Sequence, residues 1–270
     1  MSVLSDIEFV KFKDLIYKES GIHFTESNRT ILESRIREKL RKSSFENVND
    51  FFDLIKKDEG ELKEFLDSIT TNLTRFFRNN EHYSAFENHV IPDLIEHKRK
   101  TGNKTIRCWS AGCSTGEEPY TNAMVLKEWL PSDFKIEVVA SDLSLKSLMT
   151  AQEGFYSDMK VKGIPDLFLN KYFNKVEGGY RVKDEIKKLI AFDYHNLKFD
   201  SGKRNLDIVF CRNVLIYFDE AAQKNVINRF WDAMSDHSYL FIGHSESLFG
   251  MDTSFEFIRT EWTCLYGKNL

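Results

Sequence analysis

Strand and helix signals alternate throughout the later part of this 270-residue chain, and no other feature constrains its fold as strongly. Short apolar runs at 106–111, 136–140, 189–194, 206–211 and 239–243 are separated by helical patterns at about 117–130, 145–152, 165–173 and 219–235. Because helical crossovers join parallel strands, this pattern predicts a mostly parallel sheet covered on both faces. Two last apolar runs, 255–258 and 262–266, predict an antiparallel hairpin that closes the sheet.

The chain before residue 100 carries helical patterns only. Ser5-Asp6 is expected to cap a first helix whose apolar face holds Ile7, Val10, Leu15 and Ile16, and Gly21 is expected to end it. Asn28 is expected to begin a second helix with Ile31, Leu32, Ile36 and Leu40 at helical spacing, followed by helices at 47–57, 59–70 and 80–98. We therefore predict an α/β fold with a helical domain and linker over 1–78 and an α/β domain over 79–270. A small β-subdomain is expected at about 174–195, around a Gly178-Gly179 hairpin turn.

Composition narrows the class of protein. With 41% hydrophobic and 30% charged residues the chain is globular, and no apolar run approaches the roughly 18 residues that span a bilayer. We expect no nucleic-acid binding, because the net charge is −4. Four scattered cysteines without a CxxC pair argue against disulfides and structural zinc, so with no secretory signal visible we expect a cytoplasmic protein without a metal. Nothing suggests an obligate oligomer, and we expect a monomer.

Ligands of open α/β sheets bind beyond the carboxyl ends of the strands. After the first predicted strand, the small residues between Gly112 and Gly116 let a ligand approach the backbone, or they form a plain helix start with a Ser114-x-x-Glu117 capping box. Asp142, after the second strand, is placed to accept hydrogen bonds from ribose hydroxyls or to cap a helix. Because no GxGxxG or phosphate-loop motif is present, turn and acid together favour an adenosine ligand without phosphates, such as S-adenosylmethionine.

The same turn also matches the nucleophile-elbow pattern of serine hydrolases. Gly112-x-Ser114-x-Gly116 is followed by Asp207 and His244 in the chain order of a Ser-Asp-His triad. A hydrolase elbow follows several earlier strands, whereas the chain before residue 105 is helical. The hydrolase hypothesis therefore ranks well behind that of a cofactor site.

Three strings together resemble one protein family. They are TNLTRFFR at 71–78, WSAGCSTGEEPY at 109–120 and FCRNVLIYF at 210–218, and in order and spacing the chain resembles the chemotaxis receptor methyltransferase family, CheR. The resemblance implies a helical domain followed by a Rossmann-like methyltransferase domain with a small inserted β-hairpin subdomain. It also implies transfer of the methyl group of S-adenosylmethionine to glutamate side chains of chemoreceptor cytoplasmic helices, giving γ-methyl esters and S-adenosylhomocysteine.

The resemblance assigns roles to residues at matching positions. Arg78 and Tyr217 are implied to lie near the transferred methyl group as candidate catalytic residues. The implied cofactor-binding residues are Asn72, Thr74, Arg78, Glu117, Asp142, Asn196, Leu197, Arg212 and Asn213. Of these, Glu117 and Asp142 are implied to hold the amino acid and ribose portions. A noncatalytic adaptor that binds the cofactor is the alternative from another class.

Two further expectations concern partners. Residues 28–42 hold six basic and two acidic side chains, a local charge of +4, which is either a solvated helix face or a docking surface for acidic receptor helices that includes Arg35, Arg37, Lys39 and Arg41. Relatives that grip a tether peptide at the receptor C-terminus have a longer loop in the small subdomain. Here 176–182 turns directly through Gly178-Gly179, so we expect no tether-peptide binding.

Overall fold

The computed structural model describes residues 4–42, 45, 47–70 and 73–270, which form two compact units. The first unit comprises Met1–Thr71 together with Tyr217–Gln223, and the second comprises Asn72–Ile216 and Lys224–Leu270. A short segment from the later part of the chain is therefore grouped with the N-terminal helices.

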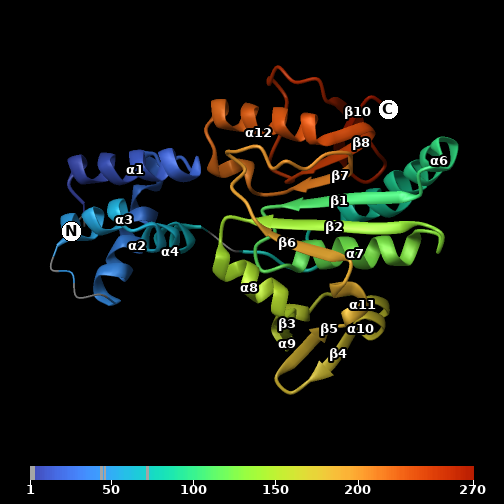
Figure 1. The fold of residues 1–270 in the computed structure, drawn as a ribbon, viewed down its shortest axis with the longest axis horizontal. Helices are drawn as coiled ribbons and strands as arrows, with labels where there is room; N and C mark the ends of the chain where they lie inside the picture. Colours follow the sequence, from blue (N-terminus) through green and yellow to red (C-terminus); the bar gives the residue numbers. More distant parts are fainter. Residues whose placement is uncertain (1–3, 43–44, 46, 71–72) are drawn as a thin grey trace. The chain divides into compact units, whose positions relative to one another are not determined.

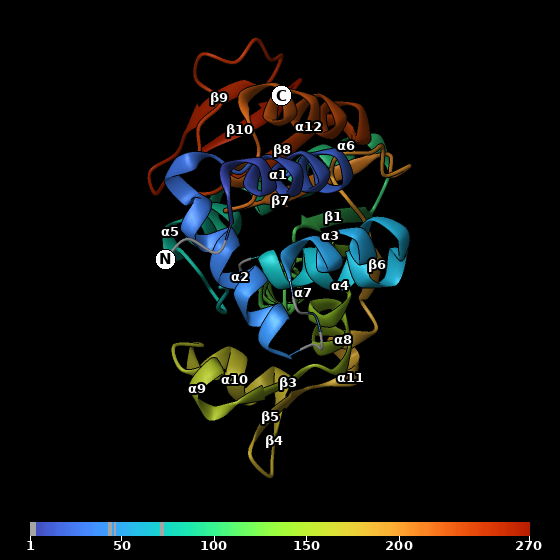
Figure 2. The same cartoon turned by 90° about the vertical axis from the view of Figure 1, so that its left-hand side faces the viewer.

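The first unit is built from helices (Figure 2). They are α1 (Asp6–Ser20), a 3-10 turn (Glu26–Asn28), α2 (Arg29–Lys42), α3 (Val48–Lys57) and α4 (Glu59–Ile69). Ser5 caps α1 in a capping box with Glu8, and Gly21 ends the helix in the left-handed conformation (φ 80°), as predicted. Asn28 belongs to the 3-10 turn that precedes α2, so the predicted helix start is one residue early.

The buried face of α1 agrees with the predicted one only in part. Ile16 is buried as predicted, but Ile7 and Val10 are 72% and 45% exposed. Phe9 and Phe12 complete the buried stripe in their place. The ring of Phe12 packs against other phenylalanines, with ring centroids 5.8 Å apart for Phe65. Large aromatic side chains remove more apolar area from water than Ile or Val do, and they decide which face is buried.

A seven-stranded sheet forms the second unit, and its strands correspond to the predicted ones (Figure 1). They are β1 (Thr105–Ala111), β2 (Lys135–Asp142), β6 (Ile190–Tyr194), β7 (Leu206–Cys211), β8 (Met234–Ile242), β9 (Glu256–Arg259) and β10 (Cys264–Lys268). The spatial order is β6-β2-β1-β7-β8-β10-β9. The first five strands in this order run parallel, and β10 pairs antiparallel with both β8 and β9, which confirms the closing hairpin.

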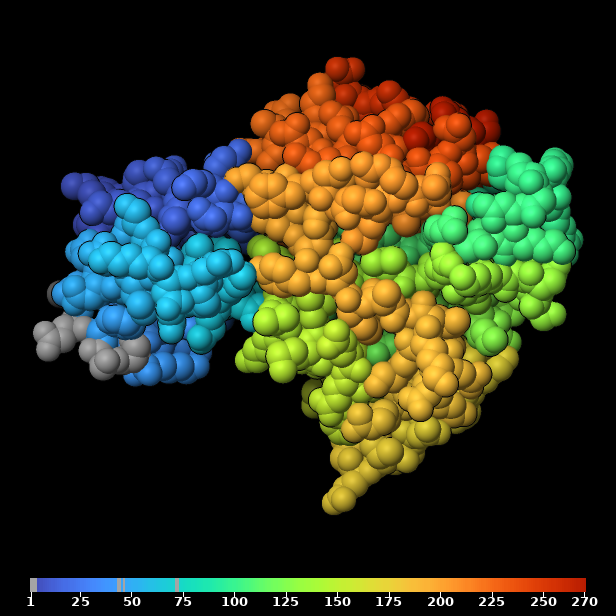
Figure 3. Space-filling view, viewed as in Figure 1, coloured from blue at the N-terminus to red at the C-terminus, as the bar shows by residue number. Residues whose placement is uncertain are grey.

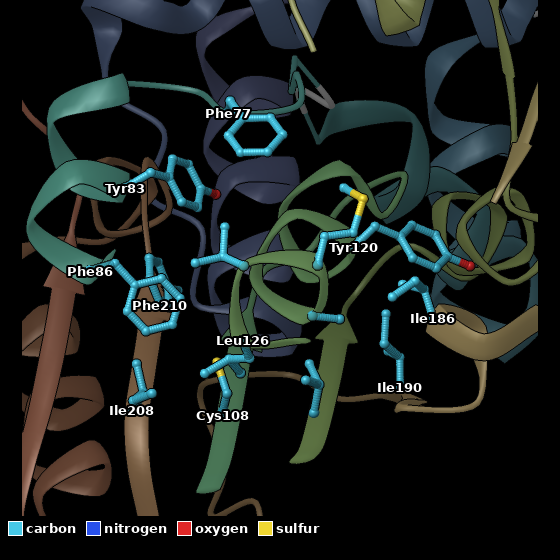
Figure 4. Packing of buried hydrophobic residues seen from close by; sticks show 14 of the residues in the cluster. Phe77, Tyr83, Phe86, Cys108, Tyr120, Leu126, Ile186, Ile190, Ile208 and Phe210 are labelled. Carbon is cyan, nitrogen blue, oxygen red and sulfur yellow. The ribbon is translucent and has the colours of Figure 1, made fainter. Parts of the chain in front are cut away.

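Helices cover both faces of this sheet. They are α5 (Asn80–Ala85), a π-helical turn (Phe86–Val90), α6 (Ile91–Thr101), α7 (Glu117–Trp129), α8 (Leu145–Glu153) and α12 (Glu220–Ala233). On one face Phe210 of β7 packs edge-on against Phe86, with centroids 5.3 Å apart, in the cluster drawn in Figure 4. On the other face Trp109 of β1 packs against Phe230 of α12, with centroids 5.3 Å apart.

A small β-subdomain is present as predicted, as a three-stranded antiparallel sheet in the order β3-β5-β4 that projects from the second unit (Figure 3). Its bounds differ from the predicted 174–195, because its first strand begins at Phe155 and Ile190–Tyr194 forms β6 of the large sheet. Its strands are β3 (Phe155–Ser157), β4 (Phe173–Val176) and β5 (Gly179–Val182), with α9 (Asp158–Val161), α10 (Asp166–Tyr172) and α11 (Asp184–Lys187) beside them. The sequence missed β3, which is only three residues long. A Cβ at Gly179 would lie 2.2 Å from the carbonyl oxygen of Tyr156, so this glycine permits the close approach of β5 to β3.

Two further observations bear on the expected class of protein. None of the helices in the described part of the chain is both long and apolar enough to cross a membrane. Cys108, Cys113, Cys211 and Cys264 all carry free thiols.

Candidate cofactor site

The strand order of the large sheet reverses between β1 and β7. From β1 the chain continues to β2 and β6 on one side, and β7 and β8 lie on the other. In open parallel sheets the crevice at such a switch point, beyond the carboxyl ends of the strands, is where ligands bind. The loops that follow β1, β2, β6 and β7 therefore form the candidate site.

The loop after β1 is a glycine turn held close to its neighbours. The backbone N–H of Gly112 donates to the carbonyl oxygen of Ser141 at 2.8 Å, which ties the turn to the end of β2. Gly112 has φ 81°, and a Cβ there would lie 2.4 Å from a methyl carbon of Val214 in the loop after β7. The turn therefore requires glycine at this position both for its backbone conformation and for its packing.

Asp142 connects this turn to the next helix. Its carboxylate accepts the backbone N–H of Ser114 and that of Ser144, both at 2.8 Å, and the residue is 9% exposed. The carboxylate thus fixes the ends of β1 and β2 relative to each other. Each of its oxygens has a second lone pair, so the predicted ribose contact is compatible with these bonds.

Adjacent acidic residues at the start of α7 point to different partners. The fully buried Glu117 carboxylate accepts the hydroxyl of Thr115 at 2.6 Å and pairs with the ammonium of Lys160 at 2.8 Å. The Glu118 carboxylate accepts the hydroxyl of Ser110 at 2.8 Å and pairs with Arg212 at 3.3 Å. Successive helix positions lie about 100° apart, which explains the divergence. Helix α7 is capped by Gly116 without a side-chain bond, so the alternative of a Ser114 capping box is wrong.

Arg212 is a buried brace between three segments of the site. Its side chain is 1% exposed, and besides Glu118 it donates to the carbonyl oxygen of Arg78 and, at 3.0 Å, to the side-chain oxygen of Asn79. Burial raises the pKa of Glu118 above its ordinary value, while Arg212 acts in the opposite direction. The brace joins the loop after β7, the start of α7 and the segment before α5.

Arg78 lies on a strained stretch of backbone. Its neighbours Phe77 and Asn79 have φ of 50° and 61°. A positive φ is uncommon for any residue other than glycine, and especially for a bulky aromatic one such as Phe77. The Phe77 ring is held against Tyr83, with centroids 5.4 Å apart (Figure 4). Arg78 is half-buried, and its guanidinium donates to the carbonyl oxygen of Leu73 at 2.9 Å. Non-glycine residues at positive φ cluster at functional sites, and Ser114 (φ 48°) and Asn213 (φ 61°) are two more in the candidate site.

Glu246 organises the loop after β7. One of its carboxylate oxygens accepts the backbone N–H of Asn213 at 2.9 Å and that of Gly243 at 2.5 Å. It therefore joins the loops that follow β7 and β8. Neither Glu246 nor Glu118 is predicted as a site residue from the sequence, because neither stands in a pattern that separates it from an ordinary surface acid. The tandem of two acids at 117–118 was the one available signal for Glu118.

The remaining candidate residues are placed as follows. His195 donates its backbone N–H to the carbonyl oxygen of Asp142 at 3.1 Å, which brings the loop holding Asn196 and the buried Leu197 beside Asp142. Thr74 is half-buried in the segment before Arg78, and Asn72 lies outside the described residues. Tyr217 belongs to the first unit, where its carbonyl oxygen accepts the backbone N–H of His23 at 2.8 Å.

Buried polar atoms without partners test whether this edge of the sheet suits a polar ligand. Ser114 Oγ, Arg212 Nε and Asn213 Oδ1 find no hydrogen-bond partner among the described residues. Buried polar groups are normally satisfied, and these three come from the loops after β1 and β7. They fit the hydroxyl, amine and ring-nitrogen groups of an adenosyl cofactor. No group of described His, Cys, Asp or Glu side chains has the geometry to hold a metal ion.

The serine hydrolase alternative is wrong. Asp207 lies near the start of β7, where it accepts the backbone N–H of Arg107 at 2.8 Å and pairs with Lys98 at 2.5 Å. Arg107 lies near the start of β1, from which the strand rises by roughly 13 Å to its end at Ala111, and Ser114 lies further on in the turn after that end. Asp207 and Ser114 therefore lie at opposite ends of the parallel strands, and no triad assembles.

The brace of Arg212 and Glu118 gives a test of how the site is held. Arg212→Met should destabilise the protein by about 3–5 kcal/mol, because it leaves a buried carboxylate without its cation. The double variant Glu118→Gln/Arg212→Met should recover part of this loss, since neither charge then remains. Urea unfolding at pH 8 measures the free energy of unfolding of the single and double variants. If the double variant lost as much stability as the two single substitutions together, the brace would be contradicted.

Comparison with known proteins agrees with this geometry. Residues 7–70 match the model of the CheR methyltransferase all-alpha domain, and residues 72–264 match that of the CheR methyltransferase SAM binding domain. The chain is 37% identical to a chemotaxis protein methyltransferase of Borreliella burgdorferi, covering 90% of this chain and 89% of that protein. It is 34% identical to the chemotaxis protein methyltransferase of Escherichia coli, covering 93% and 88%. With its fold and the loops at its switch point, the chain belongs to the CheR family of S-adenosylmethionine-dependent methyltransferases of chemotaxis.

Proposed function

We propose that this methyltransferase modifies glutamate side chains of chemoreceptor cytoplasmic helices and forms γ-methyl esters. The relatives are named chemotaxis protein methyltransferases, which supports a receptor as the substrate. The proposal that the methyl acceptor is a carboxylate rests on Arg78. Its guanidinium has five N–H donors, and the hydrogen bond that the structure gives it goes to a neutral carbonyl group. An arginine at this edge of the sheet suits the binding of a carboxylate substrate.

The chemistry requires little acid–base catalysis. The cofactor supplies an electrophilic methyl group on its sulfonium, and a glutamate carboxylate is already ionised at pH 7, so no general base is needed. The substrate must be aligned with the bond that breaks, and it must lose its water shell. Arg78 orients the carboxylate through paired N–H bonds, a geometry that lysine does not reproduce. Tyr217 either shapes the pocket or donates a hydrogen bond near the sulfonium.

The proposed cofactor contacts follow the family assignment. In this proposal Glu117 takes the ammonium group of the cofactor and Asp142 its ribose hydroxyls. Asn72, Thr74, Arg78, Asn196, Leu197, Arg212 and Asn213 complete the binding site. The unpartnered Asn213 Oδ1 and Arg212 Nε support this assignment, because a bound polar ligand would satisfy them.

Helix α2 is proposed as the receptor-docking surface, through Arg35, Arg37, Lys39 and Arg41. Arg37 lines an open pocket in which Arg29 is already paired with acidic residues, so Arg37 is the basic side chain of this pocket that we assign to docking. Lys39 is already paired with Glu64 at 2.5 Å and is only 18% exposed, so we expect it to contribute least. Complementary charge steers the acidic receptor helices and fixes their orientation.

The compact small sheet supports the proposal that the protein binds no receptor tether peptide. Strands β4 and β5 are joined by Glu177 and Gly178 alone, which leaves no extended loop between them. Calorimetric titration with the C-terminal peptide of a tethered receptor should therefore give no measurable binding. A complex of micromolar affinity would overturn this proposal.

Methyl transfer to a receptor tests the proposed reaction directly. With methyl-labelled S-adenosylmethionine and a chemoreceptor cytoplasmic fragment, mild alkali should release the transferred label as methanol. Arg78→Ala should lower kcat about 100-fold through misalignment of the carboxylate, and Arg78→Lys should rescue little of it. Arg99→Ala, at an exposed arginine of α6, is the matched control.

The outcomes separate the alternatives. Alkali-stable label would contradict carboxyl methylation. Cofactor binding without transfer to any of several receptor fragments would favour the noncatalytic adaptor.

The docking surface is tested by charge reversal. Arg35→Glu/Arg37→Glu should raise the KM for the receptor about tenfold, because two attractive charges become repulsive ones. The Kd for S-adenosylhomocysteine should stay the same. Lys63→Glu on α4 is the control, and an unchanged receptor KM in the double variant would remove α2 from the docking surface.

A further inference from the structure

The small sheet touches the glycine turn of the cofactor site at two points. The hydroxyl of Tyr156, on β3, donates to the carbonyl oxygen of Thr115 at 2.7 Å. Directly after β3, Lys160 on α9 places its ammonium 2.8 Å from the carboxylate of Glu117. A Cβ at Gly116 would lie 2.9 Å from the Tyr156 hydroxyl, so the contact is close. The small sheet therefore contributes side chains to the candidate cofactor site.

Lys160 and Glu117 are unequally exposed. The Glu117 side chain is 0% exposed, whereas that of Lys160 is 44% exposed. A carboxylate removed from water is costly unless a cation and hydrogen bonds compensate it. Here the compensation comes from Thr115 on the same turn and from Lys160, which reaches over Glu117 from the solvent side. Lys160 is the part of this arrangement that is able to move.

S-adenosylmethionine brings both charges of an amino acid to this place. The inference rests on the proposed function, in which the cofactor ammonium binds Glu117. Once that ammonium occupies Glu117, the cofactor carboxylate beside it needs a cation, and the ammonium of Lys160 has lost its partner. A lysine has three donors on a flexible stem, so it changes partners without a backbone movement.

We propose that Lys160 is a further cofactor-binding residue of this enzyme. In the ligand-free protein it covers and neutralises Glu117, and in the complex it binds the carboxylate of S-adenosylmethionine. The exchange replaces one ion pair by two, so the buried Glu117 never loses a cation. It also gives the small sheet a role in the affinity for the cofactor.

The fold does not depend on Lys160 alone, so the residue can be tested by substitution. Tyr156 is 3% exposed and packs edge-on against Phe76, with centroids 4.8 Å apart, which anchors the small sheet independently. Lys175 on β4 is a matched control. It also pairs with a carboxylate, that of Asp158 at 3.5 Å, but it is 68% exposed and makes no contact with Glu117 that the structure describes.

The test uses three ligands in calorimetric titrations of the whole protein. S-adenosylhomocysteine has both charged groups, S-adenosyl-3-thiopropylamine keeps the ammonium and lacks the carboxylate, and 5′-methylthioadenosine lacks both. Lys160→Met should weaken binding of S-adenosylhomocysteine at least tenfold, since hydrogen bonds between charged groups contribute about that much or more. Binding of the amine should stay the same or tighten, and binding of 5′-methylthioadenosine should not change. Lys175→Met should alter none of the three.

Other outcomes overturn the proposal in distinguishable ways. Tighter binding of both S-adenosylhomocysteine and the amine would show that Lys160 only competes for Glu117. An equal loss for all three ligands would show a purely structural role, and no change would remove Lys160 from the site. Glu117→Gln distinguishes a failure of the role of Lys160 from a failure of the proposed function. If Glu117→Gln leaves binding of the amine unchanged, the assignment of Glu117 to the cofactor ammonium fails. If it weakens binding of the amine while Lys160→Met changes no affinity, only the role of Lys160 fails.

Discussion

The candidate site depends on one buried guanidinium. Arg212 lies in the loop after β7, yet its hydrogen bonds go to the start of α7 and to the segment that carries Arg78. These three segments are distant in sequence, and the sheet alone would fix only two of them. Because the guanidinium is planar with donors on several sides, it holds all three at fixed geometry. The position of Arg78, and with it the proposed orientation of the substrate carboxylate, follows from this brace.

Strain and missing partners coincide at the carboxyl edge of β1 and β7. Phe77, Ser114 and Asn213 adopt left-handed backbone conformations there. Ser114 and Asn213 also carry buried polar atoms without partners. Both features cost stability, and both are typical of a site whose geometry is set before its ligand arrives. The pair of Glu117 and Lys160 is different, because both charges already have a partner. A ligand that binds Glu117 there would have to replace Lys160.

Much of this architecture could be predicted from the sequence. The alternation of strands and helices, the small hairpin and the turn at Gly112 all follow from local patterns of apolar and small residues. The failures have physical causes. The buried face of α1 is predicted only in part because the packing of aromatic rings decides which face is buried. The strand β3 is not predicted because a run of three residues is too short to show an alternating pattern. The ion pairs of Glu117 and Glu118 depend on tertiary contacts 43 and 94 residues away. The domain boundary after residue 78 and the roles of the site residues stay predictions.

We propose that the adenosyl cofactor binds at the switch point between β1 and β7. A crystal structure of the complex with S-adenosylhomocysteine tests it most directly. We predict that the ribose lies beside Asp142 and that Asn213 Oδ1 or Ser114 Oγ gains a hydrogen-bond partner. We also predict that Lys160 is displaced from Glu117. A ligand bound away from the carboxyl ends of β1 and β7, with these atoms still unpartnered, would contradict it.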